Sequence, residues 1–276
     1  MNSYPYLELL KLTLTDFHRL DFGEYKPLGS NKYKVTWKLK LLMRIDAYLN
    51  KKGIKIFRII ESDPKRRYEG RDWPAYADTM IGILRLNNIE YCFDNVIREK
   101  VPGDFIETGV WRGGATVFMR ALLKQYDVKN RVVWVADSFE GLPKPNPRKY
   151  SADRGDKHFK NKELSISLDV VKNNFKKYDL LDDQVKFLKG WFKDTLPNAP
   201  IEKLSILRLD GDMYESTMDA LTHLYPKLSI GGYIIIDDWG AVRGCKQAVL
   251  DYRNEHNITE EIMEIDWASV FWKKEK

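Results

Sequence analysis

The stretch from Asp104 to Gly114 constrains the fold more than any other part of this chain. It reads Asp-Phe-Ile-Glu-Thr-Gly-Val-Trp-Arg-Gly-Gly, and an apolar segment, 115–123, follows it directly. A short buried strand, a tight glycine turn and a helix N-terminus present backbone N–H groups at the carboxyl edge of a parallel sheet. The pattern therefore predicts a ligand site at this turn, and a purely structural strand-to-helix turn is the alternative.

The glycine spacing in this turn is not that of a dinucleotide site. Gly109, Gly113 and Gly114 do not match G-x-G-x-x-G. Glu107 also places a carboxylate where a pyrophosphate would have to lie, and the two charges would repel. The same carboxylate suits a cationic ligand, such as the amino and sulfonium groups of S-adenosylmethionine. A nicotinamide dehydrogenase is therefore a disfavoured rival.

Length and composition indicate one domain of ~200 residues with an appendage. The chain has 276 residues, of which 43% are hydrophobic, so a substantial core is expected. It contains no apolar run of ~18 residues, and its first residues do not form a signal peptide. Cys92 and Cys245 are far apart in apolar contexts and are interpreted as reduced core residues. We expect a cytoplasmic protein.

The positive charge is concentrated in one segment. Residues 31–67 contain 12 Lys/Arg and 3 Asp/Glu, whereas the rest of the chain contains 34 and 37, which leaves it mildly acidic. The basic segment could contact phosphates or an anionic membrane, and a solvated face is the simpler explanation. We expect neither nucleic acid nor membrane as a partner.

The first 70 residues are predicted to form a helical, basic extension that serves docking or oligomer contacts. Residues 1–20 have leucines at helical spacing, residues 23–34 have loop composition, and residues 54–60 are predicted to be extended or loosely helical. Residues 35–60 are basic and amphipathic, with a break in the pattern at Gly53. The apolar stripe, which is typical of a core or a subunit contact, comprises Trp37, Leu41, Leu42, Ile45 and Leu49.

Residues 71–276 alternate predicted strands with helices, which favours an α/β fold with a mainly parallel, doubly wound sheet. Helix 81–99 precedes strands near 104–109, 132–137, 185–190, 204–210 and 232–237. Two short runs at the end, Ile262–Asp266 and Val270–Trp272, predict an antiparallel hairpin, the typical ending of Rossmann-like methyltransferases. The long irregular connection 138–165 is predicted to be a lid or substrate loop.

Acidic and aromatic residues follow the predicted strands. Asp137 ends the second strand, where a carboxylate can accept hydrogen bonds from a ribose, although it could also cap a helix. Trp191 and Phe192 follow the third strand and offer a surface for an adenine ring, or simply pack in the core. Asp210, Asp237 and Asp238 end the last two parallel strands, with Asp212 close by.

Because parallel strands end at one edge of the sheet, these carboxylates should converge there and repel one another unless a cation lies among them. Oxygen ligands without cysteine or paired histidines select magnesium, calcium or manganese. The alternative is that the aspartates cap helices and face water.

Several of these segments together resemble the macrocin O-methyltransferase family of metal-dependent sugar O-methyltransferases from antibiotic pathways. The resemblance spans about residues 70–273, and the opening ten residues also resemble that family. The matching segments are Asp78–Gly82, Gly103–Met119, Val133–Pro143, Gly190–Pro197, Leu207–Ala220, Tyr225–Asp238 and Gly244–Tyr252.

The resemblance implies a class I methyltransferase that uses S-adenosylmethionine and Mg²⁺ and that forms dimers or larger homo-oligomers. It implies metal ligands at Asp210, Asp237 and Asp238. The lysine base of related catechol enzymes is replaced here by Met213. The residues implied to contact the cofactor are Thr79, Met80, Glu107, Gly109, Val110, Trp111, Arg112, Gly113, Gly114, Asp137, Ser138, Phe139, Trp191, Phe192 and Asp210.

The expected reaction is methyl transfer to a hydroxyl group on a deoxysugar of a glycosylated natural product. The proton would pass to Asp210 or Asp212, with His158 of the lid as a further candidate. A phenol or polyketide hydroxyl is the alternative acceptor. A nucleic-acid- or membrane-binding module built on residues 31–67 is the alternative from another functional class.

Overall fold

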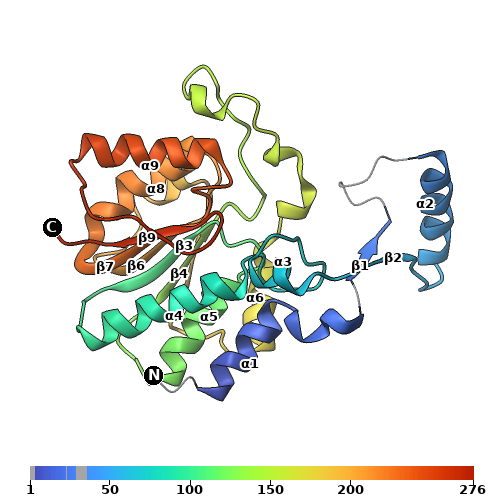
Figure 1. Cartoon of the computed structure of the whole chain (residues 1–276), viewed down its shortest axis with the longest axis horizontal. Helices are drawn as coiled ribbons and strands as arrows, with labels where there is room; N and C mark the ends of the chain where they lie inside the picture. The colour runs from blue at the N-terminus through green and yellow to red at the C-terminus, as the bar shows by residue number, and fades with distance from the viewer. Residues whose placement is uncertain (1–3, 23, 29–35) are drawn as a thin grey trace.

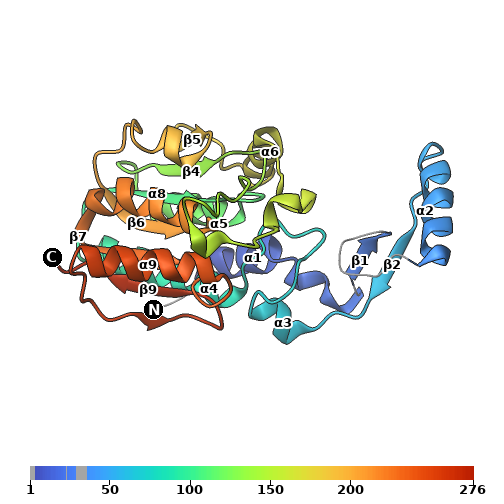
Figure 2. The ribbon, with the colours of Figure 1, turned by 90° about the horizontal axis from the view of Figure 1, so that it is seen from above.

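The computed structural model describes residues 4–22, 24–28 and 36–276. A seven-stranded sheet lies between two layers of helices, and a small arm projects from one end of this body (Figure 1). The sheet and its helices build the candidate site, whereas the arm lies apart from it in both views (Figures 1 and 2).

The predicted sheet is confirmed. The strand order is β5-β4-β3-β6-β7-β9-β8, the first five strands are parallel, and the last two form an antiparallel ending. Because β4 and β6 lie on opposite sides of β3, the strand order reverses beside β3, and such a reversal opens a ligand crevice at the carboxyl ends. The strands are β3 (Asp104–Thr108), β4 (Val133–Asp137), β5 (Val185–Lys189), β6 (Leu204–Leu209), β7 (Leu228–Ile236), β8 (Met263–Glu264) and β9 (Val270–Lys273).

The sheet separates two hydrophobic cores because successive strand residues point to opposite faces. Phe105 belongs to one core and Ile106 to the other. The first core is covered by α1 (Pro5–Leu14), α4 (Ile83–Arg98), α5 (Gly114–Gln125) and α6 (Leu168–Lys177). The second is covered by α7 (Phe192–Thr195), α8 (Tyr214–Leu224) and α9 (Arg243–Glu255), the last two lying side by side (Figure 1).

The docking helix predicted within residues 1–20 is α1, and it packs on α4 and α5. Leu7, Leu10 and Leu14 are buried in the first core. Lys11 is also buried, and its ammonium group donates to Glu8 and to Asn87, at 2.8 and 2.7 Å, and also to Glu90. A buried ammonium group needs such partners, so these contacts set the position of α1 against α4.

The arm consists of a two-stranded antiparallel sheet and one helix. It comprises β1 (Glu24–Pro27), α2 (Trp37–Asn50) and β2 (Phe57–Ile60), and α3 (Pro64–Tyr68) leads back to the body. The prediction of a loop over 23–34 is therefore wrong at 24–27, because β2 supplies pairing partners 30 to 36 positions away that local composition does not reveal. Residues 23 and 29–34 lie outside the described part of the chain. The amphipathic helix is confirmed, but none of its residues is buried.

The connection 138–165 is irregular, as predicted, and contains three short 3-10 helices, η2 (Ser151–Asp153), η3 (His158–Lys160) and η4 (Lys162–Leu164). Two further 3-10 helices, η1 (Phe17–Phe22) and η5 (Tyr225–Lys227), follow α1 and α8. Within the described residues, no helix combines the length and apolar character needed to cross a membrane.

Candidate active site

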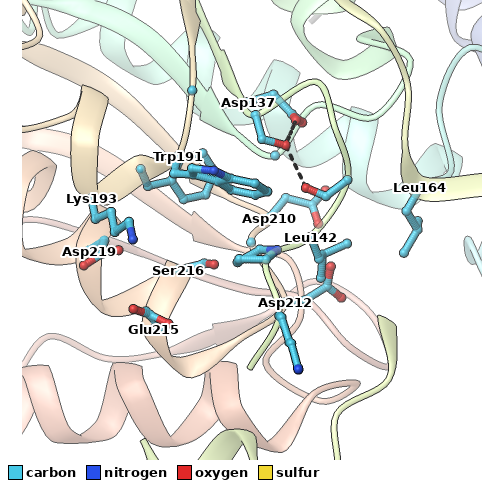
Figure 3. Close-up of a pocket in the computed structure, with 18 of the residues that line it drawn as sticks. Asp137, Leu142, Leu164, Trp191, Lys193, Asp210, Asp212, Glu215, Ser216 and Asp219 are labelled. Atoms are coloured by element: carbon cyan, nitrogen blue, oxygen red, sulfur yellow. Dashed lines mark hydrogen bonds between the residues drawn. The ribbon is translucent and has the colours of Figure 1, made fainter. Parts of the chain in front are cut away.

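A cavity of about 310 Å³ opens at the carboxyl ends of the parallel strands. The glycine turn, the connection 138–165 and the start of α8 form its walls (Figure 3). The predicted site residues that line this cavity are Met80, Gly109, Trp111, Asp137, Ser138, Trp191, Phe192, Asp210 and Asp212. Lining residues that sequence reasoning did not select include Leu142, Lys144, Leu164, Lys193, Glu215, Ser216 and Asp219.

The glycine turn lies against the end of β6. Gly109 has φ +86°, and a Cβ atom there would lie 1.8 Å from the carbonyl oxygen of Asp210. Only glycine combines this backbone conformation with so close an approach. Gly113, with φ +84°, occupies the N-cap position of α5, and its N–H donates to the Val110 carbonyl oxygen at 2.7 Å.

Asp137 lines the cavity and also connects two turns. Its Oδ2 accepts a hydrogen bond from the Val110 N–H at 2.8 Å, and its Oδ1 accepts one from the Phe139 N–H at 2.7 Å. Burial raises the pKa of Asp137, and these backbone donors oppose that shift. The carboxylate is thus held in one orientation at the edge of the cavity (Figure 3).

The remaining predicted cofactor residues support the turn from outside the cavity lining. Arg112 Nη1 donates to the carbonyl oxygens of Ala75 and Ala77, at 2.9 and 2.7 Å, and Gly114 N–H donates to that of Asp78 at 2.9 Å. These bonds fasten segment 75–80, which carries Met80, to the turn. Buried neighbours Thr79, Val110 and Phe139 fill the space behind it.

Glu107 lies behind the cavity lining, where its side chain is buried. Its Oε1 accepts a hydrogen bond from Arg208, whereas its Oε2 is buried and has no hydrogen-bond partner among the described residues. Burial raises the pKa of Glu107 to about 8, although Arg208 opposes the shift. A cationic ligand group would offset this cost, so the residue fits the amino group of S-adenosylmethionine.

Two buried arginines that the sequence interpretation missed occupy the centre of the acidic cluster. Arg208 of β6 is fully buried and donates to Glu107, to Asp210 Oδ2 at 2.8 Å and to Asp237 Oδ1. Arg85 of α4 donates to Asp237 Oδ2 at 2.5 Å. An arginine inside the apolar run 204–209 was the available signal, because a buried guanidinium needs acidic partners.

Asp210, Asp237 and Asp238 meet as predicted, with one oxygen of each lying within 4.8 Å of the others. Burial, together with the charge of Asp237, raises the pKa of Asp210 to about 6. The pKa of Asp238 is also raised, through burial and the nearby carboxylates, whereas the two arginines hold the pKa of Asp237 low. The cluster therefore carries more carboxylates than the arginines neutralise, and this oxygen donor set fits a divalent cation such as Mg²⁺.

Of the two other candidate proton acceptors, Asp212 lines the cavity, whereas His158 is not a lining residue and, among the described contacts, is linked to Asp212 only through its charge. His158 Nδ1 lies 2.7 Å from Asp156 Oδ2. Burial lowers the pKa of His158, but the bond to Asp156 and the charge of Asp212 raise it by more. Burial and the charge of Asp210 raise the pKa of Asp212 to about 7. Met213 is fully buried and cannot take the role of the catechol enzymes' lysine.

A doubly wound sheet that ends in a hairpin, with a glycine turn and an acidic residue at the first two strand ends, defines a class I methyltransferase that uses S-adenosylmethionine. The family model for Macrocin-O-methyltransferase (TylF) matches residues 3–274. The chain belongs to this family, and it is an O-methyltransferase.

Characterised relatives support this assignment. The chain is 55% identical over 209 residues to demethyldecarbamoylnovobiocin O-methyltransferase of Streptomyces niveus, covering 75% of this chain and 80% of that enzyme. It is 53% identical over 211 residues to mycinamicin III 3''-O-methyltransferase of Micromonospora griseorubida, covering 75% and 83%. The solved structure of the O-methyltransferase NovP superposes with a TM-score of 0.82 at 44% identity, covering 98% of both chains.

Proposed function

We propose that this enzyme methylates a hydroxyl group on a deoxysugar of a glycosylated natural product, using Mg²⁺ held by Asp210, Asp237 and Asp238. The convergence of these three carboxylates beside the cavity of the methyl donor supports the proposal most directly. The activities for which relatives more than 50% identical are named, on novobiocin, tetracenomycin and mycinamicin compounds, support the acceptor class.

In the proposed reaction the acceptor oxygen attacks the methyl carbon of S-adenosylmethionine. The O–CH₃ bond forms as the S–CH₃ bond breaks, and S-adenosylhomocysteine leaves. A bound Mg²⁺ would polarise the acceptor hydroxyl and favour loss of its proton. Trp191, Asp137 and the turn at Gly109 would orient the donor, and this positioning supplies much of the rate because the donor is already activated.

The proton from the acceptor hydroxyl would pass to a group near the strand ends. Asp212 lines the cavity two residues after Asp210, and His158 lies near enough to feel its charge. A general base must lie within hydrogen-bond reach of the proton that it accepts, directly or through one water. Asp210 is occupied by Arg208 and by its proposed role as metal ligand, so we assign the proton to the pair of Asp212 and His158.

The test is a panel of acceptors incubated with S-adenosylmethionine and Mg²⁺, with product detected by mass spectrometry. Each glycosylated acceptor is matched with its aglycone and with the same glycoside already methylated on the sugar. Methylation of the glycoside alone is the expected result. Methylation of the aglycone at an equal rate would contradict the sugar assignment. Calorimetry that compares the binding of S-adenosylhomocysteine with that of NAD checks the identity of the donor independently.

We also propose that the chain forms a homo-oligomer through its N-terminal extension, residues 1–70, with residues 71–276 as the methyltransferase domain. Apolar side chains on the arm support this proposal, since Trp37, Leu41 and Tyr48 are all more than half exposed. Light scattering of the full chain should give a mass above that of a monomer, and Trp37→Glu with Leu41→Glu should lower it. If instead the wild-type chain binds vesicles or oligonucleotides and this double variant does not, the arm would be a membrane- or nucleic-acid-binding surface.

Both cysteines are free and buried, which is consistent with a cytoplasmic location.

A further inference from the structure

The connection 138–165, called the lid below, contains one buried carboxylate that the proposed chemistry does not use. Asp153 ends η2 and is only 3% exposed. Its Oδ1 accepts a hydrogen bond from the Tyr214 N–H at 2.7 Å, and its Oδ2 accepts one from the Glu215 N–H at 3.2 Å. A carboxylate is seldom buried without such donors.

These two N–H groups begin α8. The residue at its N-cap position, Met213, has no side chain that can accept from the first turn. Asp153 therefore caps α8 from a segment 61 residues away in the chain. A carboxylate at a helix N-terminus satisfies unpaired donors and complements the positive end of the helix dipole.

The neighbouring helix leaves room for this contact. A Cβ atom on Gly244, at the start of α9, would lie 2.5 Å from Asp153 Oδ1 and 3.0 Å from the Tyr214 nitrogen. Gly244 does not adopt a left-handed conformation, so the backbone does not require glycine there. The close approach of Asp153 is the physical reason for a glycine at this position.

The contact is close in the chain to both candidate proton acceptors. Asp212 precedes the capped helix by two residues, and Asp156 follows Asp153 in the lid, with its N–H donating to the Asp153 carbonyl oxygen at 3.2 Å. The Asp156 carboxylate in turn holds His158 at two points: its Oδ1 accepts from the His158 N–H at 2.8 Å, and its Oδ2 lies 2.7 Å from His158 Nδ1. A short rigid path thus joins Asp153 to His158, and the capped turn joins it to Asp212.

We propose that Asp153 is a positioning residue: by capping α8 it docks the lid so that the Asp156–His158 pair is held near Asp212, which lines the cavity. This inference rests on the proposed methyl transfer for its catalytic meaning. The other end of the lid is held independently, because the Trp111 indole N–H donates to the Glu163 carbonyl oxygen at 2.8 Å. Loss of the Asp153 contact therefore frees the middle of the lid without detaching it from the donor turn.

The first test is amide hydrogen exchange of the full chain with S-adenosylhomocysteine bound. Loss of an N-cap shifts the equilibrium between the closed and the opened helix start by about fivefold. Asp153→Ala should therefore speed amide exchange in segment 211–217 and in the lid by about that factor. The control is Asp63→Ala, which removes an exposed cap of α3 that also accepts two N–H bonds. Unchanged exchange at 211–217 in the Asp153 variant would overturn the proposal, whether or not a methyl acceptor has been found.

The second test uses turnover. Asp153→Asn should lower kcat about five- to tenfold while donor affinity stays within twofold, because the donor side of the lid remains attached. In a His158→Gln background the same change should cost less than twofold, since its effect passes through His158. Full additivity of the two substitutions would refute positioning through His158. Failure of the wild-type chain to methylate any acceptor would instead refute the proposed function.

Gly244→Ala supplies a variant that leaves the carboxylate intact. Alanine has a higher helix propensity than glycine, so propensity alone predicts a more stable α9. The steric clash with Asp153 predicts the same faster exchange at 211–217 and the same loss of kcat as Asp153→Asn. A Gly244→Ala enzyme with wild-type exchange and turnover would show that Asp153 does not need this niche, and would overturn the proposal.

Discussion

Replacement of Gly109 by alanine tests whether the glycine turn and the acidic end of β6 act as one unit. The new Cβ and the Asp210 carbonyl oxygen would have to move apart by about 1.2 Å, from 1.8 Å to the 3.0 Å below which such contacts essentially do not occur. The substitution also forces alanine to adopt φ +86°. Both effects act on the backbone beside the cavity.

The magnitude follows from these two terms. A left-handed conformation costs a non-glycine residue about 1–2 kcal/mol, and overpacking against a rigid neighbour adds about 1–3 kcal/mol. A displacement of about 1 Å at a reacting centre can cost about 100-fold in rate. We therefore expect Gly109→Ala to lower the free energy of unfolding by about 2–5 kcal/mol and kcat by about two orders of magnitude.

The matched control is Gly53→Ala in the arm. Gly53 has φ +76°, and no atom lies within 4 Å of the place a Cβ would take, so it isolates the backbone strain from the clash. Thermal unfolding, initial rates with a methyl acceptor and calorimetry with S-adenosylhomocysteine provide the three readouts. The reasoning is refuted if Gly109→Ala loses no more stability than the control and keeps turnover and donor affinity within twofold of wild type.

Three further predictions concern the same site. EDTA should abolish turnover and added Mg²⁺ should restore it, whereas Asp238→Asn should stay inactive in excess Mg²⁺ with donor affinity within a few-fold; EDTA-resistant turnover would exclude the metal. Trp191→Ala should weaken S-adenosylhomocysteine binding by about 1–3 kcal/mol, measured by calorimetry, if the indole covers the adenine ring; an unchanged affinity would place the ring elsewhere. Because its partners raise the pKa of His158 above its usual value, the charged form stabilises the fold at acidic pH, and this contribution disappears as pH rises through the folded pKa. The advantage in melting temperature of wild type over His158→Gln should therefore shrink between about pH 6 and pH 8, and a constant difference would refute the pairing with Asp156.

The two buried arginines, Arg85 and Arg208, decide which substitution of a proposed metal ligand gives an interpretable result. Asp237 accepts from Arg85 and Arg208 through its two oxygens, so Asp237→Ala would leave two buried guanidinium groups short of a partner. Such a loss is strongly destabilising in its own right. An inactive Asp237 variant would therefore not identify a metal ligand. Asp238 makes no described hydrogen bond or ion pair with either arginine, and asparagine can still accept the bond that Asp238 Oδ2 receives from the Asp212 N–H at 3.1 Å, so Asp238→Asn gives the cleaner test.

The sequence by itself determined the sheet, the donor turn and the acidic strand ends. These features depend on short-range rules: strand periodicity, the turn chemistry of Gly109 and Gly113, and the convergence of parallel strand ends that brings Asp210 and Asp237 together. The same rules predicted the helix of the arm. They did not reveal the pairing of β1 with β2, because neither short strand has a sequence pattern that indicates which other segment it pairs with.

Only the tertiary structure decided which charges meet. Arg85 and Asp237 are 152 positions apart, and Asp153 and Tyr214 are 61 apart, yet both pairs are in hydrogen-bond contact. The bond between Asp153 of the lid and the start of α8 joins segments that no local pattern pairs. A buried charge must find a partner in three dimensions, and that partner depends on how whole elements pack rather than on the residues next to it in the chain.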